Sequence, residues 1–174
     1  MTKLPIIIAP DPRLKNKCLP VRRVDKEVQK LMDDMLESMY AAKGIGLAAP
    51  QVGVHKHVIV IDIAKKEEKP APLCMADPET VWVSEEKVCN EEGCLSLPDQ
   101  FAEVTRPARV RVRYLDRNDS TREIEADGLL ARCIQHEMDH LKGTLFVDHI
   151  SALKRNIILR KLTKIKKLQK AEAG

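Results

Sequence analysis

The sequence predicts an α+β fold, with short antiparallel or mixed β-sheets around a central helix and a C-terminal helix docked outside. Apolar residues recur at helical spacing in three separate stretches, whereas residues 58–63 and 109–114 show the composition or alternation of strands. The chain has no internal repeat and no low-complexity linker. We therefore expect one domain over residues 1–174, with a core over about 1–150 and a basic helix over about 151–170.

The first elements follow from prolines and from a helical apolar face. Four prolines interrupt the segment that ends at Val21, which predicts extended chain rather than helix. Asp25 then offers an N-cap, and apolar residues from Val28 to Met39 recur every three or four positions. This pattern predicts a helix that ends before Gly44, with its methionines in the core.

The middle of the chain shows short strands separated by loops. Small residues dominate 44–53, which predicts a loop, and the β-branched run 58–63 predicts a strand. Residues 65–72 are charged and contain prolines, so we expect an exposed loop there. A short strand is expected at 81–83, and the glycine in 91–98 predicts another loop-like stretch.

The last third of the chain predicts a hairpin and two helices. Residues 109–114 alternate strictly, which places Val110, Val112 and Tyr114 toward the core. A turn at 118–120 allows 122–125 to pair with this strand. Residues 127–141 predict the central helix, and 151–170 predict the C-terminal helix. The C-terminal helix has an apolar stripe of Leu153, Ile157, Ile158, Leu162, Ile165 and Leu168.

Composition excludes several classes of protein. Aromatic residues are only 3%, too few for a set of platforms that stack single-stranded nucleic acid. The apolar run near the N-terminus is too short for a signal peptide or a membrane span, so we expect a cytoplasmic protein without a membrane or DNA partner. The five cysteines are Cys18, Cys74, Cys89, Cys94 and Cys133, and none shows CxxC spacing. Their odd number and spacing predict free thiols, of which any special one would be catalytic or metal-bound.

One constellation indicates metal chemistry. His136, Glu137 and His140 form an H-E-x-x-H motif in the predicted central helix, where residues four apart lie on one face and can meet a single ion. Alone, this short motif also arises by chance. A catalytic metal normally takes three protein ligands. Cys94, in a glycine-containing loop, is favoured as the third ligand over Cys133, which suits a small apolar core position.

Three separated segments resemble the signature motifs of the peptide deformylases. Gly44–Gln51 is similar to G-x-G-x-A-A-x-Q, Glu92–Ser96 to E-G-C-x-S, and Gln135–His140 to Q-H-E-x-D-H. The resemblance covers about Pro10 to Ile150. It implies removal of the N-formyl group from the initiator methionine of nascent polypeptides, with release of formate. It also implies one divalent metal ion, typically Fe²⁺, with Zn²⁺, Ni²⁺ or Co²⁺ also able to bind.

The resemblance also implies catalytic roles. Glu137 would accept the proton of the attacking water and pass it to the leaving amine. The side-chain amide of Gln51 and the backbone N–H of Leu95 would donate hydrogen bonds to the oxyanion. The metal would be held by Cys94, His136 and His140.

A pocket for the substrate methionine is implied by the same resemblance. Gly46 would let the backbone lie close to the substrate. Arg132 stands where relatives often carry an apolar residue, so the resemblance does not define the shape of the pocket there. Asp77 stands where many relatives carry Asn. The pocket walls would include Ile45, Leu129, Cys133 and the ring of His136.

Glu92, Arg106 and Asp139 are expected to form a charge network that braces the ligands, although ordinary surface ion pairs are an equal alternative. The basic C-terminal helix could dock on ribosomal RNA, or it could be a solvated lysine-rich face. Two other functions also remain open at this stage, a zinc endopeptidase and a non-catalytic metal-binding module.

Overall fold

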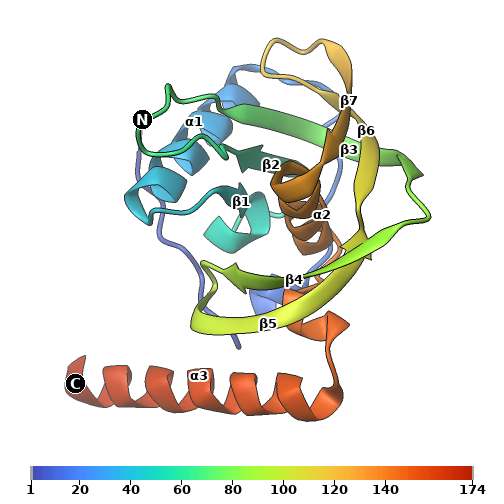
Figure 1. Cartoon of the computed structure of the whole chain (residues 1–174). Coiled ribbons are helices and arrows are strands. Elements are labelled where there is room, and N and C mark those ends of the chain that lie inside the picture. The colour runs from blue at the N-terminus through green and yellow to red at the C-terminus, as the bar shows by residue number, and fades with distance from the viewer. Residues whose placement is uncertain (1, 174) are drawn as a thin grey trace.

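Two antiparallel sheets and three α-helices make up the computed structural model, which describes residues 2–173 (Figure 1). The larger sheet has the strand order β1-β2-β3-β6-β7, and β4 pairs with β5 in a separate sheet. The predicted α+β fold is confirmed. The strands are β1 (Gly46–Ala48), β2 (Val58–Ile61), β3 (Leu73–Val83), β4 (Lys87–Cys94), β5 (Leu97–Pro107), β6 (Arg109–Leu115) and β7 (Thr121–Asp127). The helices are α1 (Lys26–Ala41), α2 (Gly128–Leu141) and α3 (Ala152–Ala173), with 3₁₀ turns η1 (Pro12–Lys15), η2 (Ala49–Val52) and η3 (Phe146–His149).

Helix α1 forms as predicted. The Asp25 carboxylate accepts a hydrogen bond from the Val28 backbone N–H at 3.0 Å, which satisfies one of the free donors at the helix start. Met32, Met35 and Met39 are fully buried against β1 and β2. These methionines therefore belong to the core.

Helix α2 lies between the two sheets, with β4 and β5 on the far side from the larger sheet (Figure 1). Ala131, Ile134 and Met138 pack in a core cluster with residues of β2, β3 and β6. Val110 and Val112 of β6 are fully buried in that cluster, as their alternation predicts. The other side of α2 is free to present polar side chains toward β4.

Several predicted element boundaries were wrong. The predicted loop 44–53 contains β1 and η2, and 81–83 is only the end of β3. Most of strand β3 was not predicted, because Pro78 and two register shifts interrupt the alternation of its side chains. The loop-like stretch 91–98 belongs to β4 and β5 and the tight connection between them, and η1 interrupts the extended opening segment.

Helix α3 extends away along one side of the molecule (Figure 1). Only Ile158 and Leu162 of its predicted apolar stripe are buried, and both pack in a cluster with Ile7 and Phe146. The rest of the stripe is exposed: Leu153, Ile157, Ile165 and Leu168. Within residues 2–173, no helix has the length and hydropathy that a membrane crossing requires.

Candidate metal centre

Three potential ligand atoms converge between α2 and the end of β4. The side chains of Cys94, His136 and His140 place their ligand atoms within 4.8 Å of one another. The Cys94 sulfur lies 3.4 Å from Nε2 of His140. Cys133 is not part of this group, so the geometry favours Cys94 as the third ligand, as the sequence had suggested.

The position of Cys94 depends on a local irregularity of the small sheet. The β4–β5 register shifts between Gly93 and Cys94, so that Cys94 lies opposite Leu97. A Cβ atom on Gly93 would meet Cε1 of Phe101 at 2.6 Å, closer than real contacts allow. A side chain at position 93 would therefore displace the Phe101 ring directly before Cys94.

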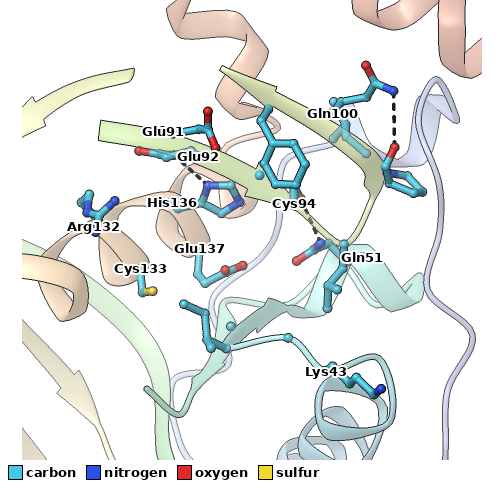
Figure 2. Close-up of a pocket in the computed structure, with 18 of the residues that line it drawn as sticks. Lys43, Gln51, Glu91, Glu92, Cys94, Gln100, Arg132, Cys133, His136 and Glu137 are labelled. Atoms are coloured by element: carbon cyan, nitrogen blue, oxygen red, sulfur yellow. Dashed lines mark hydrogen bonds and ion pairs between the residues drawn. The ribbon is translucent and has the colours of Figure 1, made fainter. Parts of the chain in front are cut away.

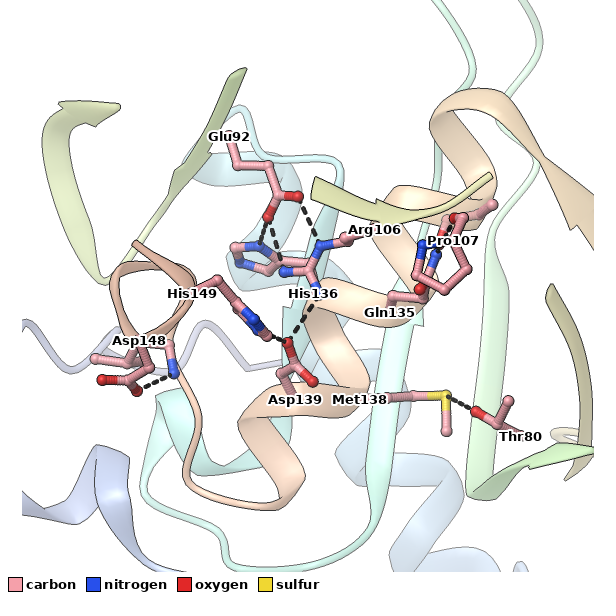
Figure 3. Close-up of polar contacts among 12 residues, drawn as sticks. Thr80, Glu92, Arg106, Pro107, Gln135, His136, Met138, Asp139, Asp148 and His149 are labelled. Atoms are coloured by element: carbon pink, nitrogen blue, oxygen red, sulfur yellow. Dashed lines mark hydrogen bonds and ion pairs between the residues drawn. The ribbon is translucent and has the colours of Figure 1, made fainter. Parts of the chain in front are cut away.

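His136 is oriented by a buried charge network (Figure 3). Its Nδ1 lies 3.0 Å from the Glu92 carboxylate, which leaves Nε2 for a ligand. Glu92 accepts hydrogen bonds from Arg106 at 2.6 and 2.9 Å, and Arg106 also donates to Asp139 at 2.9 Å. Glu92 and Arg106 are buried, so these are not ordinary surface ion pairs.

The charge network keeps Glu92 ionised. Burial alone would raise the pKa of Glu92, but hydrogen bonds from His136 and Arg106 outweigh it and lower the pKa to about 2. The structure extends the network by one member that the sequence did not suggest. The Nε2 atom of His149 lies 2.7 Å from Asp139 (Figure 3).

Glu137 lies beside the candidate ligands and is buried. Burial raises its pKa to about 7. Its Oε1 atom has no hydrogen-bond partner, although it is buried. A Cβ atom on Gly46 would meet Glu137 Oε2 at 2.5 Å, so the bare backbone of β1 is what lets Glu137 lie here.

Gln51 is held in one orientation by the residues around it. Its Oε1 accepts a hydrogen bond from the Ala48 backbone N–H at 2.9 Å. Its Nε2 donates to the Ser96 hydroxyl at 3.0 Å and lies 3.5 Å from the Cys94 sulfur (Figure 2). The amide donor therefore points toward the candidate metal centre. Leu95 lines the same pocket, with its side chain against Gly44.

The candidate centre opens into a pocket of about 540 Å³ (Figure 2). Its lining includes every residue expected around the substrate: Ile45, Gly46, Leu129, Cys133 and His136. Phe101, which is 60% exposed, also lines it and was not predicted, because no motif marks it. Burial raises the pKa of the Cys133 thiol to about 12, consistent with an inert wall residue.

The two residues that differ from the family's usual pattern, Arg132 and Asp77, lie in different parts of the structure. Arg132 lines the pocket. Asp77 does not, and its carboxylate instead accepts hydrogen bonds from the backbone N–H groups of Val21 and Arg22 at 2.8 and 2.7 Å. Asp77 therefore anchors the opening segment to β3.

The donor set and the local charge fit a divalent cation. One sulfur and two imidazole nitrogens suit the softer divalent ions better than Mg²⁺ or Ca²⁺. Burial alone would lower the pKa of His136, but the charge of Glu137 and hydrogen bonds with Cys94 and Glu92 raise it well above its usual value. The centre therefore favours positive charge. Burial lowers the pKa of His140, which keeps that imidazole in the neutral form that binds metals.

Comparisons with known proteins agree on one family. The model of the polypeptide deformylase family matches residues 3–156. A peptide deformylase of Methylocella silvestris is 58% identical over 171 residues, or 97% of this chain and 87% of that protein. One from Rhizobium meliloti is 51% identical over 173 residues, or 99% of each chain.

Solved structures show the same similarity. The crystal structure of a peptide deformylase from Ehrlichia chaffeensis matches with a TM-score of 0.92 at 42% identity, covering 97% of this chain and 99% of that one. A structure of the Ehrlichia chaffeensis protein in complex with actinonin matches with a TM-score of 0.90 at 45% identity, covering 94% and 98%.

Proposed function

Since this chain belongs to the polypeptide deformylase family and removes the N-formyl group of nascent polypeptides, we propose that Cys94, His136 and His140 hold the metal ion on which the family depends. The product of this hydrolysis, besides the free amino terminus of methionine, is formate. Membership in this family also excludes the two alternatives of a zinc endopeptidase and a non-catalytic metal-binding module. The convergence of the three ligand atoms within 4.8 Å carries the proposal.

We propose Fe²⁺ as the native ion, with Zn²⁺, Ni²⁺ or Co²⁺ able to take its place. A thiolate and two imidazoles support this choice, because such ligands suit any of these softer ions. When bound, the ion acts as a Lewis acid and lowers the pKa of water. Metal analysis of protein purified without oxygen, together with formate release, tests the assignment.

Glu137 moves the proton in the proposed mechanism. Its carboxylate accepts a proton from the attacking water and delivers it to the amine of methionine as the C–N bond breaks. A pKa raised to about 7 suits both roles near neutral pH, because the group then gives up and takes a proton with similar ease. The unpartnered Oε1 atom is available to that water.

Gln51 and Leu95 stabilise the negative charge that develops on the formyl oxygen. The Gln51 amide is fixed by Ala48 and Ser96 with its donor toward the centre, so no reorientation is needed during the reaction. The backbone N–H of Leu95 follows the ligand Cys94 directly in the chain. Loss of one such donor costs about 10²–10³ in turnover.

A Glu137→Ala variant tests the assignment of the proton-transferring residue. We expect it to keep a full complement of metal and to lose nearly all formate release from formyl-Met-Ala-Ser. Glu103→Ala, an exposed carboxylate on β5 outside the pocket, is the matched control and is expected to retain turnover. Full deformylation by Glu137→Ala would overturn the assignment.

We further propose that the protein works in the cytoplasm and docks on ribosomal RNA through α3. Three cationic side chains of α3 line a groove: Arg160, Lys164 and Lys167. The rest of its lining is Asn156, Leu159 and Thr163. Phosphate contacts of this kind weaken steeply as salt increases.

Removing α3 would not test ribosome docking cleanly, because Ile158 and Leu162 are part of the core. Replacing Arg160, Lys164 and Lys167 by Gln keeps these core contacts. We expect this triple variant to lose ribosome affinity at low salt in co-sedimentation. The control replaces Lys65, Lys66 and Lys69 of the exposed loop after β2. Equal loss in both variants, or none in the α3 variant, would contradict the proposal.

A further inference from the structure

Arg132 is one of two basic side chains that line the pocket, the other being Lys43, and it lies beside the apolar wall formed by Leu129 and Cys133. It lies on the face of α2 that forms one wall of the pocket, three residues after Leu129 and four before His136. Figure 2 shows Arg132 and Cys133 on the same stretch of α2, beside His136. The side chain is half-buried.

The guanidinium of Arg132 forms no ion pair with any residue that the structure describes. Among residues 2–173, no carboxylate oxygen lies within 4 Å of it, although Arg106 and Arg111 each contact two carboxylates. Its charge nevertheless acts inside the pocket. Burial and Glu137 raise the pKa of Cys133, and Arg132 opposes them. An unpaired cation at a half-buried position is available to a ligand in the pocket.

The path of an extended peptide follows from the edge of the larger sheet. Within residues 2–173, β1 pairs only with β2, and on its other edge Gln51 takes the Ala48 N–H. This leaves the backbone of Gly46 free on that edge, and Gly46 lines the pocket. A free strand edge supplies backbone hydrogen bonds to an extended peptide. Side chains of an extended peptide alternate in direction, so residues 1 and 3 point to the same side, about 7 Å apart.

The methionine side chain is proposed to lie against Leu129, Cys133 and His136, on the α2 side of the pocket. The third residue of the nascent chain then points toward the same wall, where Arg132 lies. The second residue points away from it. We propose that Arg132 makes the protein selective for nascent chains that carry Asp or Glu as the third residue. This inference rests on the proposed methionine pocket.

The test compares formyl-Met-Ala-Xaa-Ser peptides in which Xaa is Glu, Lys or Ala. Each kcat/KM is divided by that of the Ala peptide, so a general loss of activity cancels. For a partly exposed ion pair we expect the Glu peptide to exceed the Lys peptide by about five- to tenfold, and this ratio to fall in 0.5 M KCl. The same charges placed at the second residue are expected to give a ratio near one.

Two variants and a control assign the selectivity to this side chain. Arg132→Met is expected to bring the Glu/Lys ratio close to one, and Arg132→Glu to invert it. Arg23→Met is the control, because Arg23 is exposed and remote from the pocket. It is expected to keep the wild-type ratio.

The outcomes separate this inference from the proposed function. Deformylation of the Ala peptide with an unselective wild type would overturn the role of Arg132 alone. A ratio that is unchanged in Arg132→Glu, or a preference located at the second residue, would do the same. Failure of the wild type to release formate from any of the peptides would instead contradict the proposed function.

Discussion

At Gly46 a side chain would occupy the place of the Glu137 carboxylate, the proposed proton-transferring group. Its Cβ would lie 2.5 Å from Oε2 and 3.0 Å from Cγ of Glu137. We therefore expect Gly46→Ala to displace Glu137 and lower kcat by about 10- to 100-fold, because displacements near 1 Å cost this much. Formate release and metal content measured on the same preparation check this. Metal content should be unchanged, since no ligand is touched.

Gly53→Ala is the control for this substitution. Gly53 has a positive φ of 82° and lies outside the pocket, so a side chain there strains the backbone without approaching Glu137. It should lower thermal stability and preserve kcat. A Gly46→Ala variant with wild-type kcat would show that Glu137 tolerates displacement.

Arg106 is the residue on which the buried charge network depends. Its side chain is 5% exposed and contacts two carboxylates. Arg106→Gln leaves Glu92 buried without its main partner, and we expect a loss of about 3–5 kcal/mol in the free energy of unfolding. Metal affinity should fall about 10- to 100-fold, because Glu92 orients His136.

Urea denaturation and competitive metal titration measure these two effects. The control is Arg111→Gln on β6, whose ion pairs with Glu123 and Glu125 are exposed. It should change stability by about 0.5 kcal/mol or less. Unchanged metal affinity in Arg106→Gln would remove the bracing role.

At the scale of elements, Asp148 joins η1, η3 and α3. Its carboxylate contacts Lys15 and Arg155 and accepts the backbone N–H of Leu145. Burial alone would raise the pKa of Asp148, but the contact with Lys15, the Leu145 N–H and Arg155 lower it below its usual value of 3.8. Asp148→Asn is expected to cost about 1–2 kcal/mol at pH 7.

The lowered pKa of Asp148 determines how its contribution to stability changes with pH. Because the pKa is lower in the folded protein, the stabilisation is complete above the usual pKa and is lost as the pH falls through the folded value. The stability difference between wild type and Asp148→Asn should therefore shrink below about pH 4. Asp127→Asn, whose side chain makes no cap hydrogen bond, is the control and should show no such change. A constant difference down to pH 3 would contradict the assignment.

Elements whose signal is local could be predicted from the sequence. The Asp25 cap and methionine spacing define α1, and strict alternation defines β6. Strand β4 has no such signal, because Lys87, Cys89 and Glu91 are exposed and its partner β5 is also largely solvated. Its pairing depends on contacts between residues up to 20 positions apart, such as Lys87 with Pro107. Local patterns cannot report such contacts.

The sequence likewise predicted some residues of the candidate site and missed others. Helical spacing predicted His136 and His140 as ligands, and the motif around Cys94 added a third candidate; the ligand atoms of all three converge. His149 and Phe101 were missed because each reaches the site only through tertiary contacts, with Asp139 and Gly93 respectively. The apolar stripe of α3 was overestimated, since periodicity does not say whether a partner covers it.

At the scale of the whole molecule, the candidate metal centre lies between the β4–β5 sheet and helix α2, which packs on the larger sheet. The β4–β5 sheet pairs with no strand of the larger sheet in the part of the chain that is described. Cys94 belongs to this small sheet, whereas His136 and His140 belong to α2, which packs on the larger one. Other polar links run from Glu92, Arg106 and Pro107 of the small sheet to α2, and from Ser96 to Gln51. A bound metal therefore cross-links the small sheet to the rest of the protein.

This arrangement predicts that metal removal destabilises the whole protein and not only the site. At a metal concentration of 100 times Kd, binding adds about 2.7 kcal/mol to the folded state. For a chain of this size we expect chelation to lower Tm by about 5–10 °C. Cys94→Ser should start near the metal-free Tm and respond little to chelator. Cys89→Ser, an exposed cysteine on the same strand, should keep the full shift. Equal shifts in both variants, measured by anaerobic thermal denaturation, would mean that Cys94 does not hold the ion that links the two sheets.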